Sequence, residues 1–163
     1  MKRVLAILAL ALIIVSCQGP MGPQGPMGPQ GPPGEPGGGI NWKVIDFVIE
    51  SDQWELVDGV NQLNSFFIYT FDGDNAPKEL QYVVDNLGDV MGYYVGRLNG
   101  EDLFSPLPYE TYYGTTTDNG EYLWSETYKF DYTRSSISFM VYYSDFYTDT
   151  RPGDCTFRMS FKW

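Results

Sequence analysis

The sequence predicts an all-β head domain over residues 40–163, built as an antiparallel β-sandwich with one short helix. Apolar and aromatic residues alternate with polar residues in several short runs, which is the period of a half-buried strand. Turn-forming pairs such as Asp58-Gly59 and Asn99-Gly100 separate the runs. Every aromatic residue of the chain lies after residue 39, which confines the core-forming residues to this domain. Many short strands with tight turns favour a sandwich of either the jelly-roll or the immunoglobulin-like type.

Six runs are expected to form strands. The clearest alternation lies in residues 121–133, where aromatic residues share one parity: Tyr122, Trp124, Tyr128, Phe130 and Tyr132. Residues 137–143 and 157–163 repeat the alternation. Three more runs, rich in β-branched and aromatic residues, are 42–50, 66–71 and 90–98.

Residues 77–88 differ from the strand-like runs. Their apolar residues recur at helical spacing: Leu80, Val83, Val84 and Leu87. Pro77 stands at the start of the segment and Gly88 at its end, as is common for helices. We therefore expect a short helix that covers one end of the sheet stack.

Residues 1–16 have the organisation of a secretory signal peptide. Two basic residues, Lys2 and Arg3, precede the apolar run VLAILALALIIV, and the small residue Ser16 follows it. The apolar run is shorter than the roughly 20 residues that a transmembrane helix needs. The segment is therefore expected to be removed.

Residues 14–17, with the sequence IVSC, resemble the lipobox of bacterial lipoproteins. The resemblance implies that Cys17 receives a diacylglyceryl group on its sulfur, becomes the first mature residue and is acylated on its amine. In the lipoproteins of two-membrane bacteria an aspartate at the next position tends to retain the protein at the inner membrane, so Gln18 implies an outer-membrane location, periplasmic or exposed at the surface. The alternative is an ordinary signal peptide with an incidental Cys17.

A collagen-like repeat follows the lipobox. Glycine occupies every third position, and proline follows it in five of the six triplets; the glycines are Gly19, Gly22, Gly25, Gly28, Gly31, Gly34 and Gly37. Collagen requires this phase because only glycine fits at the crowded axis of three polyproline II chains. Two interpretations remain open: a triple helix that makes the protein a homotrimer, or a single stiff polyproline II spacer. Both make residues 17–39, which end in the flexible run GGG, a stalk.

The complete arrangement resembles the collagen-like lipoproteins found as surface proteins in some bacteria. The resemblance covers the chain from end to end, and its specific part is the first 39 residues. The motif LPY at 107–109 and the final strand ending in Trp163 add a general likeness. The resemblance carries over no catalytic residues.

Composition argues against several classes of function. The chain has 21 acidic and 10 basic residues and a net charge of −11, so nucleic acid is not an expected partner. It contains no histidine, which removes Ser-His-Asp and Cys-His arrangements and the commonest zinc sites. We expect no catalytic residues, no metal site and no cofactor, and the protein is not expected to be an enzyme.

The remaining reactive side chains have structural interpretations. Lipidation of Cys17 leaves Cys155 without an intramolecular partner, and its apolar surroundings predict a buried small hydrophobe. Glu121 and Glu126 are five residues apart on one expected strand and therefore point to opposite faces, which argues against a catalytic pair. The run DGDN at 72–75 is expected to be a turn and not a calcium loop.

Adjacent tyrosines offer the most room for function. The pairs are Tyr93-Tyr94, Tyr112-Tyr113 and Tyr142-Tyr143. Neighbours on a strand face opposite sides, so one member of each pair is expected to be exposed or covered by something else. Exposed tyrosines bind sugar rings or protein partners well, and they also suit an interface between subunits.

Three functional hypotheses follow. The first is a non-enzymatic, lipid-anchored envelope protein that displays its head on the stalk in a structural or adhesive role, with a membrane and a host or envelope glycan or protein as partners. The second is a glycan-binding module on the same stalk, whose exposed aromatic residues form one open platform beside Asp, Asn or Arg. The third is a secreted hydrolase with two carboxylates about 5 to 10 Å apart.

Overall fold

A computed structural model describes residues 39–118 and 120–163 of the chain. The predicted signal peptide, the lipidation site Cys17 and the collagen-like glycines lie outside the described residues. Within the described part, no helix is long and apolar enough to cross a membrane.

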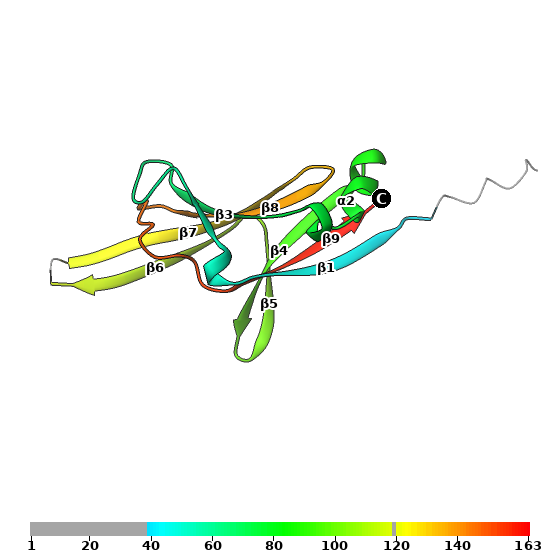
Figure 1. The fold of residues 1–163 in the computed structure, drawn as a ribbon. Coiled ribbons are helices and arrows are strands. Elements are labelled where there is room, and N and C mark those ends of the chain that lie inside the picture. Colours follow the sequence, from blue (N-terminus) through cyan, green and yellow to red (C-terminus); the bar gives the residue numbers. More distant parts are fainter. Residues whose placement is uncertain (1–38, 119) are drawn as a thin grey trace, which may run out of the picture. The chain divides into compact units, whose positions relative to one another are not determined.

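The head consists of two antiparallel sheets (Figure 1). The four-stranded sheet has the order β1-β9-β4-β5, with β1 (Trp42–Ile49), β9 (Cys155–Lys162), β4 (Asp89–Leu98) and β5 (Glu101–Pro106). The five-stranded sheet has the order β2-β3-β8-β7-β6, with β2 (Glu55–Val57), β3 (Phe66–Asp72), β8 (Ser136–Tyr143), β7 (Gly120–Tyr132) and β6 (Tyr109–Thr117). The predicted all-β sandwich is confirmed at this level.

The predicted turns and strands differ in how well they match the structure. Asn99 and Gly100 form a two-residue hairpin between β4 and β5, and both have the positive φ that such a turn requires. The run at 72–75 is a 3₁₀ turn, Gly73–Asn75. All six predicted runs form strands, but β2, β5 and β6 were not predicted. β2 has only three residues, too few to show an alternation. β5 and β6 are mostly exposed, and a strand that is largely solvated lacks the alternation of a core-facing strand.

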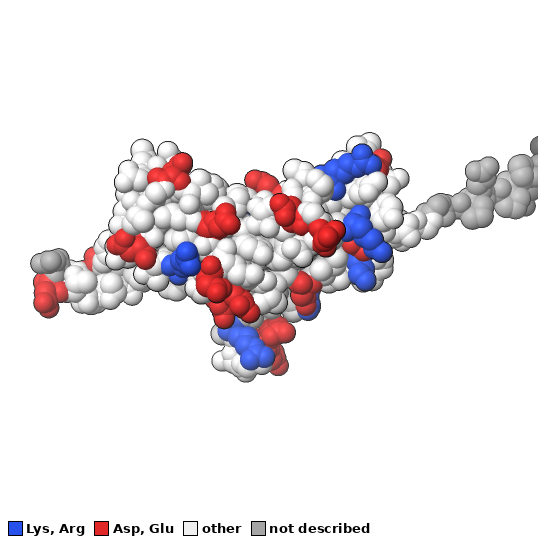
Figure 2. Space-filling view, viewed as in Figure 1, with Lys and Arg blue, Asp and Glu red and all other residues white. Residues whose placement is uncertain are grey.

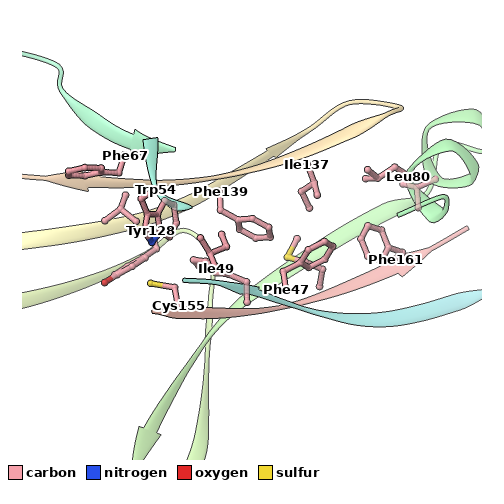
Figure 3. Packing of buried hydrophobic residues seen from close by; sticks show 14 residues of the cluster. Phe47, Ile49, Trp54, Phe67, Leu80, Tyr128, Ile137, Phe139, Cys155 and Phe161 are labelled. Atoms are coloured by element: carbon pink, nitrogen blue, oxygen red, sulfur yellow. The ribbon is translucent and has the colours of Figure 1, made fainter. Parts of the chain in front are cut away.

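The core lies between the inner faces of the two sheets (Figure 3). Phe139 of β8 stacks on Phe157 of β9, with ring centroids 4.4 Å apart. Phe47 of β1 packs against Phe139 at 5.4 Å. Cys155 is buried in the same cluster, as the sequence predicts, and burial raises the pKa of its thiol to about 12. Trp54, which follows a short 3₁₀ turn at Ser51–Gln53, is fully buried beneath the loop before β9.

The helix α2 (Glu79–Asp85) is shorter than the predicted segment. Leu80 and Val83 are buried in the core, but Val84 is exposed and Leu87 is 94% exposed. Leu87 adopts a φ of 53°, outside the helical region, so the helix ends before it and the helical spacing predicted for Leu87 does not hold.

The end of α2 meets the last strand closely. The Gly88 N–H donates to the carbonyl oxygen of Val83 at 2.8 Å, and a Cβ at Gly88 would lie 2.0 Å from the carbonyl oxygen of Lys162. Tyr82 of α2 stacks on Trp163 at 5.6 Å. The helix therefore covers one end of the sandwich, as expected, because glycine allows the backbones to touch.

Gly88→Ala is expected to lower the free energy of unfolding by about 1–3 kcal/mol, because the new methyl group cannot fit against the Lys162 carbonyl. Urea unfolding of residues 18–163, followed by tryptophan fluorescence, measures the change. Gly153→Ala is the matched control, since nothing lies within 4 Å of a Cβ there, and its effect is expected to stay within about 0.5 kcal/mol. Equal stability of the two variants would contradict the close approach.

The thiol of Cys155 is expected to react with iodoacetamide much more slowly in the folded chain than in urea. Burial moves the thiol pKa from 9.0 to about 12, so the reactive thiolate at pH 8 falls on the order of 1000-fold. The stability that this shift contributes is present below pH 9 and is lost as the pH rises toward 12. Labelling of residues 18–163, read by mass spectrometry, tests this, and equal rates would contradict a buried thiol.

Candidate functional site

The hairpin of β6 and β7 extends past the rest of its sheet (Figure 1). β7 pairs with β8 from Glu126 to Tyr132, and the Ser125 carbonyl oxygen still accepts from the Ser144 N–H, whereas residues 120–124 pair with β6 alone. Side chains of the same parity as the core residue Tyr128 continue along this free part of the strand. The core-facing side of the sheet therefore runs outward to a position where the four-stranded sheet does not cover it.

An open groove of about 390 Å³ lies along this uncovered side. One wall comes from the hairpin and β8, and the other from the loop that joins β8 to β9. The lining residues are Thr115, Tyr122, Trp124, Glu126, Tyr143, Asp145, Tyr147, Thr150, Arg151, Pro152 and Gly153. The groove is therefore built from segments that lie far apart in the sequence.

Aromatic rings dominate the hairpin wall. Tyr113 and Trp124 are directly opposite each other in the strand pairing, and their rings stack with centroids 5.4 Å apart. Tyr122, two residues before Trp124 on the same face, stacks on it at 5.8 Å. Tyr122 remains exposed, because no strand of the opposite sheet lies over it. The three rings form one continuous aromatic surface beside the groove.

Two carboxylates and one guanidinium complete the site. Asp145 accepts a hydrogen bond from the Tyr122 hydroxyl, and Glu126 accepts one from the Tyr128 hydroxyl at 2.6 Å. Arg151 lies exposed at the groove, where its Nη1 donates to the carbonyl oxygen of Asp52 at 3.3 Å. Carboxylate acceptors and a cationic donor therefore lie around an apolar surface.

The tyrosine hydroxyls keep their protons at neutral pH. The hydrogen bond to Asp145 raises the pKa of Tyr122, and burial raises the pKa of Tyr143. A hydrogen bond to Asp149 raises the pKa of Tyr147. The groove therefore offers neutral phenols next to its acids, and such a surface suits a ligand with apolar faces and hydroxyl groups at its edges.

The structure separates the members of each predicted tyrosine pair onto opposite faces. Tyr143 lines the groove, and Tyr142 lies on the outer face of β8, where it stacks on Phe66 at 4.8 Å. Tyr113 joins the aromatic surface, whereas Tyr112 is 76% exposed on the other side of the hairpin and donates to Glu110.

The third pair, Tyr93-Tyr94, takes no part in the groove. Tyr94 packs among Tyr109, Tyr128 and Phe157 in the core, where burial raises its pKa to about 12. Tyr93 lies on the outer face of β4, opposite Arg158 of β9 in the strand pairing. Of the six predicted tyrosines, the groove and its aromatic surface thus bring together Tyr113 and Tyr143.

Sequence reasoning missed most of the groove. Tyr122 and Trp124 carry the alternation of a core strand, which says nothing about where the covering sheet ends. Asp145, Tyr147 and Arg151 lie in an irregular loop without a motif. One feature of the sequence pointed to the groove: the alternating aromatic residues of β7 continue to Tyr122, two residues from the start of the strand at Gly120.

Comparisons of the chain with protein-family models, with curated proteins and with solved structures find no match.

Proposed function

We propose that the chain is a non-enzymatic, lipid-anchored protein of the bacterial outer membrane that displays its β-sandwich head on a short collagen-like stalk. The observation that carries the proposal is the order of three segments: a lipobox ending at Cys17, glycine in strict phase up to Gly37, and a folded head whose first strand begins at Trp42. A stiff segment between anchor and head serves to hold the head away from the membrane. The role is structural or adhesive.

The physical properties of the stalk support this arrangement. At about 3.1 Å per residue, a polyproline II segment of this length spans on the order of 50 Å. Two or more acyl chains hold a protein stably, because each buried methylene contributes about 0.8 kcal/mol. We further propose that the stalk associates as a triple helix and makes the protein a homotrimer, since lipid anchors confine the chains to one surface and raise their effective concentration.

Cys17→Ala is expected to release the protein from the membrane. The unaltered chain, expressed with its signal in a two-membrane bacterium, should incorporate labelled palmitate and enter the detergent phase of a Triton X-114 partition. The Cys17→Ala chain should do neither, because the acceptor sulfur is gone. Cys155→Ala is the matched control and should behave like the unaltered chain. Failure of the unaltered chain to incorporate palmitate would contradict the anchor.

Glycan binding is the second candidate function, and the groove favours it. Sugar rings present apolar C–H faces that pack on aromatic side chains, and their hydroxyls donate to carboxylates and accept from guanidinium groups. Trp124, Asp145 and Arg151 supply these three kinds of contact within one groove. The acidic charge of the chain disfavours anionic sugars, so the expected ligand is a neutral glycan.

Trp124→Ala is expected to weaken neutral-glycan binding roughly tenfold or more, as truncation of a central aromatic contact does. The ligand is first identified by screening residues 18–163 against an array of neutral glycans, and affinities are then measured by calorimetry. Tyr112→Ala is the matched control, since Tyr112 lies on the opposite side of the same hairpin. Binding unchanged by Trp124→Ala, or no binding by the unaltered chain, would refute the assignment.

We also propose that the sandwich is of the jelly-roll type. β1 pairs with β9 and β3 pairs with β8, so two strand pairs are nested as in a rolled-up ribbon. In the immunoglobulin order the first strand lies beside the second, whereas β1 and β2 belong to different sheets. The nested pairing supports the first type over the second.

A further inference from the structure

The outer face of the four-stranded sheet carries exposed apolar side chains. On β1, Trp42 is 70% exposed and Val48 is 58% exposed, and Val44 lies between them. Met91 of β4 is 56% exposed, and Phe104 of β5 is also exposed. In the strand pairing Val44, Ser160 and Met91 form one row across β1, β9 and β4. We call the outward side of these three strands, together with Phe104, the outer face.

The polar side chains of the outer face neutralise one another. Asp46 and Arg158 form a bidentate ion pair, with both N–O distances at 2.7 Å. The Arg158 guanidinium also lies over the Phe104 ring, 4.7 Å from its centroid. Four residues after Arg158 on β9, Lys162 is the pairing partner of Asp89 on β4. Arg97 of β4 also points outward and forms an ion pair with Asp102 of β5 at 3.5 Å. The outward side chains of the four strands therefore include three cations and three carboxylates.

This balance distinguishes the outer face within an acidic protein. The chain has a net charge of −11, and acidic side chains are spread over much of the side of the head seen in Figure 2. Two copies that approach through acidic surfaces repel each other. A neutral surface with apolar side chains allows copies of the same chain to meet, and burial of those side chains then stabilises the contact.

The outer face includes β1, which is the first strand after the collagen-like repeat in the sequence. The last collagen-like glycine is Gly37, and β1 begins at Trp42. Five residues span at most about 18 Å even when fully extended. A triple helix holds three chain ends together at its axis. The first strands of three heads, with Trp42 and Val44 near their start, must then lie close to the same axis.

We propose that the outer faces of three copies of this chain meet around the axis of the stalk and form the contact between the heads. The proposal rests on the proposed triple-helical stalk and adds which surface the copies share. It leaves the groove outside the contact, because Tyr122 and Trp124 belong to the other sheet.

Photo-crosslinking of the lipid-anchored full chain in its membrane tests the proposal. A photoreactive residue at Met91 is expected to yield dimers and trimers of this chain, identified by mass spectrometry. The same residue at Leu63, which is exposed in the loop before β3, is the matched control and should yield at least about tenfold less. Adducts only with lipid or with other proteins, equal yields at both positions, or no adducts would overturn the proposal.

Two further variants separate this contact from the stalk. Val44→Glu places a carboxylate at the row shared with Met91, and it is expected to abolish the Met91 crosslinks, whereas Leu63→Glu should leave them unchanged. Membrane anchoring of all variants is measured in parallel. Crosslinks that survive Val44→Glu would refute the outer face as the contact.

A third variant tests the stalk itself, because Gly28→Ala disrupts a triple helix. Loss of the Met91 crosslinks in Gly28→Ala, with the anchor intact, would support three heads gathered by the stalk. Crosslinks unaffected by Gly28→Ala would overturn the proposed dependence of this contact on the stalk, while palmitate labelling still reports on the anchor.

Discussion

The stacking of Phe139 on Phe157 joins the two sheets, and the rest of the head depends on this contact. A continuous series of rings extends from it in both directions, through Phe47 on one side and through Tyr94 and Tyr128 on the other. Aromatic pairs add about 0.5–1.5 kcal/mol each beyond the apolar area that they bury, and truncating one ring of a core costs several kcal/mol. The sheets are therefore held at a separation that these rings determine.

The groove follows from the same aromatic series. Tyr128 is buried because the four-stranded sheet lies over it, and Trp124 and Tyr122 continue its parity beyond the last pairing of β7 with β8. One alternating strand thus supplies both core side chains and an open aromatic surface. The part of β7 that pairs with β8 contributes to the core, and the part before Glu126 is open because β8 does not continue beside it. The loop from Asp145 to Gly153 then turns the open surface into a groove with polar groups.

The groove and the outer face lie on different sheets, so the two proposed roles use separate surfaces of the head. The groove belongs mainly to the five-stranded sheet, and the outer face belongs to the four-stranded sheet. The proposed contact between heads uses the four-stranded sheet, so the β6–β7 hairpin lies outside it. The net charge of −11 opposes contacts between copies through acidic surfaces.

The sequence by itself determined the all-β class, the six predicted strands, the helix around Leu80 and Val83, and the tight turn at Asn99 and Gly100, because these features depend on neighbours within a few residues. It also predicted that the tyrosine pairs split between faces. The tertiary structure alone decided the short strand β2, the largely exposed strands β5 and β6, the exposure of Leu87 and the groove. Tyr122 meets Asp145 through the pairing of β7 with β8, and no local pattern states where a covering sheet stops.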